Sequence, residues 1–206
     1  MTVPNYWRRA TRELAERDTV LAELIKTHRG LTLGLRGDAF QTLTRAIVGQ
    51  QISVKAAQSV WDRLVATVGV IVPEKLARAE PSALRSSGLS GRKVEYIQDL
   101  ARHFRDSTIV PTAWPELSDD AIIEQLLGVR GIGRWTAEMF LIFNLGRPDV
   151  LPLGDLGLQR AMAVSYNRGR ELNERRMRMI ARPWAPWRSV ATWYLWRSLD
   201  PIPVEY

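Results

Sequence analysis

The segment from Asp119 to Met162 constrains the fold of this 206-residue chain more than any other. Apolar residues recur at helical spacing up to residue 127, and the sequence then reads GVRGIG over residues 128–133. A second apolar helical pattern follows from Trp135. Glycine can adopt positive φ and leaves no side chain between the backbone and a partner. The pattern therefore predicts two helices joined by a tight hairpin.

The start of the second helix is a candidate site for a phosphate. The first N–H groups of a helix have no partner within it, and the positive end of the helix dipole attracts anions. A nucleic-acid duplex supplies phosphates in a row. An ordinary helix-turn-helix corner, with glycines that only make the turn, is the alternative. The predicted DNA-binding residues here are Arg130, Gly131, Gly133 and Arg134.

A single carboxylate follows the hairpin by about twenty residues, in the sequence LPLGDLGLQR of residues 151–160. Proline and glycine end one segment, and Asp155 is a typical N-cap for the apolar helix that begins after it. A carboxylate beside helix N–H groups is expected to stay ionised at neutral pH. Capping explains Asp155, and its place after a DNA-binding hairpin also makes it a candidate catalytic group.

Three separated motifs appear in a fixed order. They are AFQTLTRAIVGQQISVKAAQSVWDRL with GLSGRKVEYIQDLA, then LLGVRGIGRWTAEMFLIF with PLGDLGLQRA, and finally PWRSVATWYLW. Together they resemble the helix-hairpin-helix/Gly-Pro-Asp superfamily of DNA glycosylases, and within it the 3-methyladenine DNA glycosylase II branch. The resemblance covers roughly residues 38–200.

The resemblance implies an enzyme that flips a damaged base out of the duplex and hydrolyses its glycosidic bond. Asp155 would be the catalytic residue, stabilising positive charge on the sugar or orienting a water. Bifunctional relatives carry a lysine where this chain has Trp135, so the resemblance implies a monofunctional glycosylase. Trp135, Met139 and Trp196 are expected to form the base pocket. Plain core packing is the alternative for each tryptophan.

Two polar turns add candidate DNA contacts. Gln50 and Gln51 break a helical pattern, either as linkers that satisfy helix ends or as side chains that project into a groove. The resemblance places at Gln51 the residue that wedges into the gap left by the flipped nucleotide, although a family member has an apolar side chain there. Arg92 and Lys93 start a helix, where cations oppose the dipole. A nearby phosphate explains them, and so does solvation.

Composition narrows the class of partner. The net charge of +7 favours an anionic partner, nucleic acid before membrane. The absence of cysteine excludes disulfides, thiolate-bound metals and the iron–sulfur cluster that some relatives carry. No cofactor is expected to be required and no metal to be held by side chains. Relatives suggest a structural Na⁺ or K⁺ on the backbone carbonyls of Leu127, Val129 and Ile132. Without an apolar leader or a span-length segment, a cytoplasmic protein is expected, associated with the nucleoid if the source is bacterial. It is also expected to be a monomer.

The expected fold is all-α, with two helical subdomains and a cleft between them that holds Asp155. Residues 38–146 would form the bundle that carries the helix-hairpin-helix, and residues 1–37 and 147–206 the second subdomain. The expected substrate is double-stranded DNA containing alkylated bases such as 3-methyladenine and 7-methylguanine. A related glycosylase for mispaired or deaminated bases is one alternative. A non-catalytic DNA-binding module is the other, but such a module needs neither the aspartate nor an aromatic pocket.

Overall fold

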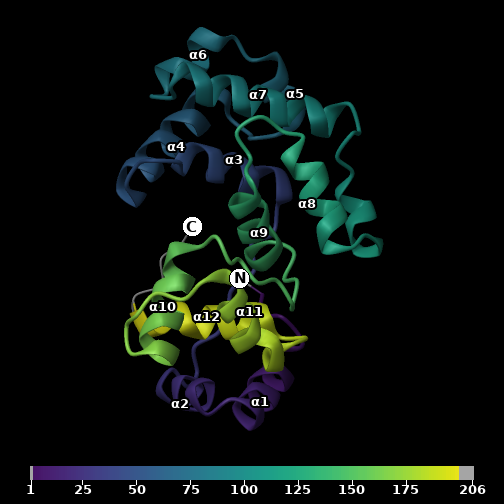
Figure 1. Cartoon of the computed structure of the whole chain (residues 1–206). Helices are drawn as coiled ribbons and strands as arrows, with labels where there is room; N and C mark the ends of the chain where they lie inside the picture. Colours follow the sequence, from purple (N-terminus) through teal and green to yellow (C-terminus); the bar gives the residue numbers. More distant parts are fainter. Residues whose placement is uncertain (1, 200–206) are drawn as a thin grey trace. The chain divides into compact units, whose positions relative to one another are not determined.

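The computed structural model describes residues 2–199. Met1 and residues 200–206, which fall within the two predicted ranges of the second subdomain, lie outside the described residues. The predicted all-α fold is confirmed, because residues 2–199 form helices and no strand, apart from an isolated bridge between Thr2 and Leu35 (Figure 1). None of the helices in this part of the chain is long and apolar enough to cross a membrane.

The described residues form twelve α-helices and two short 3-10 helices. Side-chain caps begin many of them, as at Asp18, Asp38, Ser53, Ser90 and Ser118. In chain order the helices are α1 (Trp7–Arg17), α2 (Thr19–Thr27), α3 (Ala39–Gly49), α4 (Val54–Val68), α5 (Pro73–Arg78), α6 (Pro81–Ser86), α7 (Gly91–Arg105), η1 (Pro111–Glu116), α8 (Asp119–Leu127), α9 (Arg134–Phe143), α10 (Leu156–Asn167), α11 (Glu174–Ala181), η2 (Arg182–Trp184) and α12 (Arg188–Leu199).

The chain divides into two compact units. One unit comprises residues 37–140, and the other comprises the remaining described residues. The second boundary therefore falls inside α9, before the predicted end of the bundle at residue 146. The segment before α3 holds the end of α9, which explains the difference. Arg36 donates its N–H to the Phe143 carbonyl (2.9 Å), and the Asn144 side chain donates to the Arg36 carbonyl (3.1 Å).

The unit of residues 37–140 is built around α7, which packs against α3, α5 and α6 (Figure 1). The Phe104 ring of α7 contacts Phe40 of α3, with centroids 5.2 Å apart, and Trp114 of η1, at 6.4 Å. Trp114 in turn contacts Phe140 of α9 at 5.3 Å. Such edge-to-face pairs contribute about 0.5–1.5 kcal/mol beyond their buried area. This row of rings fixes α9, and the hairpin before it, to α7.

The other unit is centred on α12, which packs against α1, α2 and α10. A helix surrounded by other helices buries residues on all of its sides, and the eight consecutive or near-consecutive positions 189–195 and 197 of the twelve-residue α12 are buried. Trp7 of α1 meets Trp193 edge-on at 5.2 Å between centroids and Tyr194 at 5.8 Å. Trp184 and Trp187 are also buried. Core packing therefore explains the tryptophans before and within α12, with the exception of Trp196.

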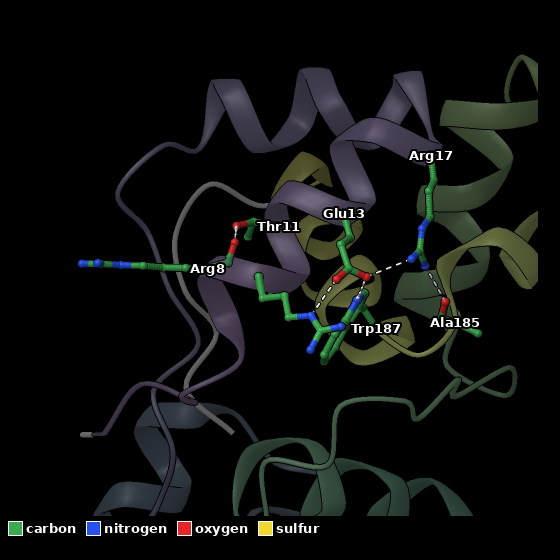
Figure 2. Close-up of polar contacts among 7 residues, drawn as sticks. Arg8, Thr11, Glu13, Arg17, Ala185 and Trp187 are labelled. Carbon is green, nitrogen blue, oxygen red and sulfur yellow. Dashed lines mark hydrogen bonds and ion pairs between the residues drawn. The ribbon is translucent and has the colours of Figure 1, made fainter.

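A polar cluster around Glu13 ties α1 to the turn before α12 (Figure 2). The Glu13 carboxylate accepts hydrogen bonds from Arg9 (2.7 Å), Arg17 (2.8 Å) and the indole Nε1 of Trp187 (2.8 Å). Arg17 also donates to the carbonyl of Ala185 at 2.7 Å. The hydrogen bond from Arg9 is the largest cause that holds the pKa of Glu13 below its ordinary value, and the one from Trp187 is the next.

We expect the stability provided by Glu13 to depend on pH. A carboxyl group with a depressed folded pKa stabilises the fold above its unfolded pKa, about 4.3 for Glu, and loses this effect as the pH falls through the folded pKa. Glu13→Gln should therefore lower Tm at neutral pH, and the difference from wild type should shrink below about pH 4. Thermal unfolding followed by circular dichroism measures both effects. Glu16→Gln, on the exposed side of α1, is the control. Equal Tm values for wild type and Glu13→Gln at every pH would contradict the expectation.

Candidate functional site

The predicted hairpin lies between α8 and α9, over residues 128–133. Gly131 has a φ of +82°, which side-chain-bearing residues rarely adopt, and a Cβ here would overlap the ring of Tyr96 in α7. Gly133 lies outside this left-handed region, and a Cβ on it would meet no atom within 4 Å. Its carbonyl already accepts the N–H of Ala137 at 3.0 Å, as in a helix. Of these two glycines, only Gly131 is therefore required by the fold of the hairpin itself.

The two hairpin arginines differ in how the fold uses them. Both side chains are exposed. The backbone N–H of Arg130 donates to Oδ2 of Asp99 in α7 at 2.9 Å. Arg134 lies 3.5 Å from the carboxylate of Glu138, one helical turn later, with 62% of its side chain exposed. Both guanidinium groups thus face solvent beside the start of α9, as a phosphate contact requires.

The turn between α3 and α4 contains the two predicted glutamines. The Gln50 side chain donates from Nε2 to the Gly131 carbonyl of the hairpin at 2.8 Å. Gln51 is exposed and has a φ of +58°. Of the two explanations that the sequence leaves open, a satisfied polar linker describes Gln50, and a projecting side chain describes Gln51.

The two cations at the start of α7 also differ. Arg92 is exposed. Lys93 is half-buried, and its Nζ donates to the carbonyls of Val48 and Gln50 at 2.8 Å each. Burial lowers the pKa of Lys93 below its ordinary value. A contact within the protein, rather than the predicted phosphate or solvation, thus accounts for the placement of Lys93.

Asp155 is the N-cap of α10, as its sequence setting predicts. It is 8% exposed, and its Oδ1 accepts hydrogen bonds from the N–H of Leu158 (2.6 Å) and from Nε1 of Trp196 (2.8 Å). The Trp196 ring stacks on Phe143 with centroids 5.7 Å apart and planes 12° apart. A Cβ at Gly157 would lie 3.1 Å from Oδ1 and 3.3 Å from the indole. The carboxylate is thus oriented from two directions, and the bare glycine leaves room for this arrangement.

The sequence does not indicate Phe143 or Gly157 as parts of this site. The only local signal is a glycine two positions after the capping aspartate, where helix propensity alone would disfavour it. Trp196 was predicted as a wall of the base pocket, and the structure adds a direct contact between its indole and Asp155. Trp196 is therefore placed to position the carboxylate, whether or not it also touches a base.

The remaining predicted pocket residues differ in exposure. Trp135, in the first turn of α9, is 40% exposed, whereas Met139, one turn later, is 7% exposed. A buried methionine fills gaps in a core. Core packing therefore accounts for most of the Met139 surface, and Trp135 retains a face that a ligand can reach.

A separate hollow of about 670 Å³ lies in the unit that contains Asp155, and none of the predicted site residues lines it. Arg178 in its wall pairs with Glu174, and Arg188 pairs with Asp149, each at 2.6 Å. Within residues 2–199, no group of three or more His, Asp or Glu side chains could hold a metal ion.

Comparison with known proteins identifies the family. Residues 44–186 match the model of the HhH-GPD superfamily of base excision DNA repair proteins. The chain belongs to this superfamily. The resemblance found in the sequence is thereby confirmed.

Solved structures extend the likeness over nearly the whole chain. The crystal structure of a DNA-3-methyladenine glycosidase from Bacillus halodurans is 35% identical, with a TM-score of 0.89, and the match covers 97% of this chain and 93% of that one. The 3-methyladenine DNA glycosylase Mag1 of Schizosaccharomyces pombe, in complex with abasic DNA, is 27% identical with a TM-score of 0.79, and the match covers 96% of this chain and 98% of that one.

A relative found by sequence is longer than this chain. The Bacillus subtilis protein YfjP is 31% identical over 190 residues, and the match covers 88% of this chain but 66% of YfjP.

Substitution of Gly131 and of Gly133 separates the effects on folding and on DNA binding. Gly131→Ala should lower Tm, because a residue with a side chain costs about 1–3 kcal/mol in this backbone region and the new methyl group overlaps Tyr96. Gly133→Ala has space and should keep Tm, but should weaken binding to all duplex DNA alike and flatten its salt dependence slightly. Circular dichroism and fluorescence anisotropy across salt concentrations measure these effects. Unchanged DNA affinity in a folded Gly133→Ala variant would mean that the hairpin is only a corner.

Proposed function

We propose that this protein is a monofunctional DNA glycosylase that hydrolytically releases alkylated bases, such as 3-methyladenine and 7-methylguanine, from duplex DNA in base excision repair. The observation that carries the proposal is the buried, doubly hydrogen-bonded carboxylate of Asp155 in a member of the HhH-GPD superfamily. The names of the similar solved proteins support alkylated bases as the substrate class.

The reaction needs a negative charge near the sugar. As the glycosidic bond of a flipped nucleotide breaks, positive charge develops on the sugar ring, and a carboxylate stabilises it or orients the attacking water. Asp155 is suited to this role because its orientation is set before the reaction begins. The N–H of Leu158 and the indole of Trp196 both hold Oδ1. Loss of such a preorganised group typically costs about 3–4 kcal/mol of transition-state stabilisation.

The small number of candidate catalytic groups at the site favours a cationic base as the substrate. Alkylation of a ring nitrogen can make adenine or guanine positively charged and a better leaving group, so little help from a general acid is needed. An aromatic face attracts such a base by about 0.5–2 kcal/mol, with the higher values in desolvated sites. Trp135 offers an exposed aromatic surface at the start of α9. Its identity also leaves no amine at the position where bifunctional relatives carry a lysine nucleophile.

The hairpin carbonyls fit a monovalent cation, which we propose as a structural ligand. The Val129 carbonyl accepts the N–H of Ile132 at 3.2 Å and retains a second lone pair. The Leu127 carbonyl lies at the end of α8, where carbonyls have no partner within the helix. When bound to these oxygens and to the carbonyl of Ile132, Na⁺ or K⁺ would add positive charge beside the DNA-binding hairpin.

A panel of duplex oligonucleotides, each with one damaged base, tests the proposed function. We expect release of free 3-methyladenine and 7-methylguanine, an intact abasic strand, and no covalent adduct after borohydride treatment. Asp155→Asn should retain the helix cap, since Asn caps as well as Asp, and should retain DNA affinity. Its base release should fall by roughly 10²–10³-fold. Release of mispaired or deaminated bases alone would favour the related glycosylase class, and full activity of Asp155→Asn would remove this residue from the mechanism.

Trp196→Phe tests whether the indole positions Asp155. The substitution keeps a ring against Phe143 but removes the Nε1–H donor to Oδ1. Because a hydrogen bond to a charged group is worth about 1.5–3 kcal/mol, kcat should fall by at least roughly tenfold for every released base, with little change in KM. Trp193→Phe, in the core of α12, is the control and should lower Tm without this kcat effect. A loss confined to cationic bases would instead assign Trp196 to stacking on the base.

A further inference from the structure

The C-terminal end of α3 is held by a lysine from another helix. Nζ of Lys93 lies 2.8 Å from the carbonyls of both Val48 and Gln50. Carbonyls at this end of a helix have no partner within it, and they carry the negative end of the helix dipole. The ammonium group satisfies both needs. Two of its three N–H donors are used inside the protein, which is an unusual arrangement for a lysine whose task is to bind phosphate.

Gln50 extends this contact to the hairpin. Its backbone carbonyl accepts from Lys93, while its side-chain Nε2 donates to the carbonyl of Gly131 at 2.8 Å. One residue is therefore tied to α7 through its backbone and to the hairpin through its side chain. All of these groups belong to the unit of residues 37–140.

The same face of α7 also contacts the hairpin directly. Lys93, Tyr96 and Asp99 recur every three residues, so their side chains lie along one side of the helix. The Tyr96 ring occupies the space above Gly131, and Oδ2 of Asp99 accepts the N–H of Arg130 at 2.9 Å. One helical face thus sets the position of both the turn at residues 49–53 and the hairpin.

Gln51 lies in this turn with a backbone conformation that the neighbouring residues have to stabilise. Its φ of +58° is rare for a residue with a long side chain, and its surface is exposed. Gln50 anchors the chain before it, and Ser53 anchors the chain after it by accepting the N–H of Ala56 at 3.3 Å. Strain that persists because the surroundings impose it is typical of functional positions.

We infer that Lys93 is a positioning residue of the glycosylase: by pinning the end of α3 and, through Gln50, the turn to the hairpin, it sets where Gln51 stands when a base leaves the duplex. The inference rests on the proposed function. Lys93 acts on the opening of the duplex and on base release, and it contributes no phosphate contact to DNA affinity.

The main test compares Lys93→Met with Arg105→Met, which removes an exposed cation from the last turn of the same helix. For Lys93→Met we expect roughly tenfold slower single-turnover base release and a smaller fluorescence rise from 2-aminopurine placed beside the lesion, as expected for a loosened hydrogen-bonded network. Affinity for undamaged duplex and its salt dependence should match wild type. Arg105→Met should retain wild-type base release. If Lys93→Met instead weakens binding to undamaged DNA, lowers the salt slope by about 0.9 and leaves base release from the bound complex unchanged, Lys93 is a phosphate contact and the inference is wrong.

A second variant keeps the test decisive if Lys93→Met does not fold. Gln50→Leu removes the link to Gly131 but leaves the backbone carbonyls on Lys93 in place, and it should slow base release in the same way. When both single variants fold, the double variant should be no slower than the slower single one, because residues in one network are not additive. Multiplying effects of the two substitutions would overturn the inference, as would wild-type base release by Gln50→Leu.

Hydrogen–deuterium exchange separates this inference from the proposed function. In the free protein, Lys93→Met should speed exchange of the amides of residues 50–53 relative to wild type, and Arg105→Met should not. This readout needs neither DNA nor catalysis. If wild type releases no base from any oligonucleotide but exchange changes as expected, the proposed function fails while the role of Lys93 in the turn stands. Unchanged exchange in Lys93→Met would refute that role.

Discussion

The contact between the Tyr96 ring and the bare backbone of Gly131 is the constraint on which the candidate DNA-binding face depends. A single methyl group at this position would overlap the ring, so α7 can approach the hairpin this closely only across a glycine. The approach brings Asp99 within reach of the Arg130 N–H and the Gly131 carbonyl within reach of Gln50. These two hydrogen bonds depend on that packing, because each forms only when its donor and acceptor lie within about 3 Å.

An aromatic side chain also packs over a glycine in the other unit. Gly157 leaves the space in which the Trp196 indole reaches Asp155. In both places an aromatic side chain lies over a glycine, next to a polar group that the proposed chemistry uses. Glycine is costly inside a helix by about 1 kcal/mol relative to alanine. At Gly157, within α10, this local cost accompanies a tertiary hydrogen bond that a larger residue would displace.

Local patterns were sufficient to predict much of this structure. The apolar periodicity predicted the helices on both sides of the hairpin, and the Pro-Leu-Gly-Asp sequence predicted the cap at Asp155, because both features depend on neighbouring residues. The partners of the candidate site residues could not be predicted in this way. Trp196 contacts a residue 41 positions away, and Lys93 contacts one 45 positions away. Such pairs arise from helix packing, and nothing in a sequence window distinguishes a lysine that caps a distant helix from one that meets a phosphate. The contacts of Arg36 with Phe143 and Asn144 at the end of α9 could not be predicted for the same reason.

The identity of the donors to Asp155 limits what protons can do at this carboxylate. An indole Nε1–H and a backbone N–H can donate a hydrogen bond but cannot accept one, unlike the imidazole or hydroxyl groups that orient carboxylates in many hydrolases. Neither Trp196 nor Leu158 can therefore take up a proton from Asp155 or pass one through it. These two contacts hold Oδ1 in position and give it no proton acceptor. A carboxylate held in this way suits the proposed reaction, in which a cationic base departs as a neutral molecule with the bonding electron pair and the positive charge passes to the sugar.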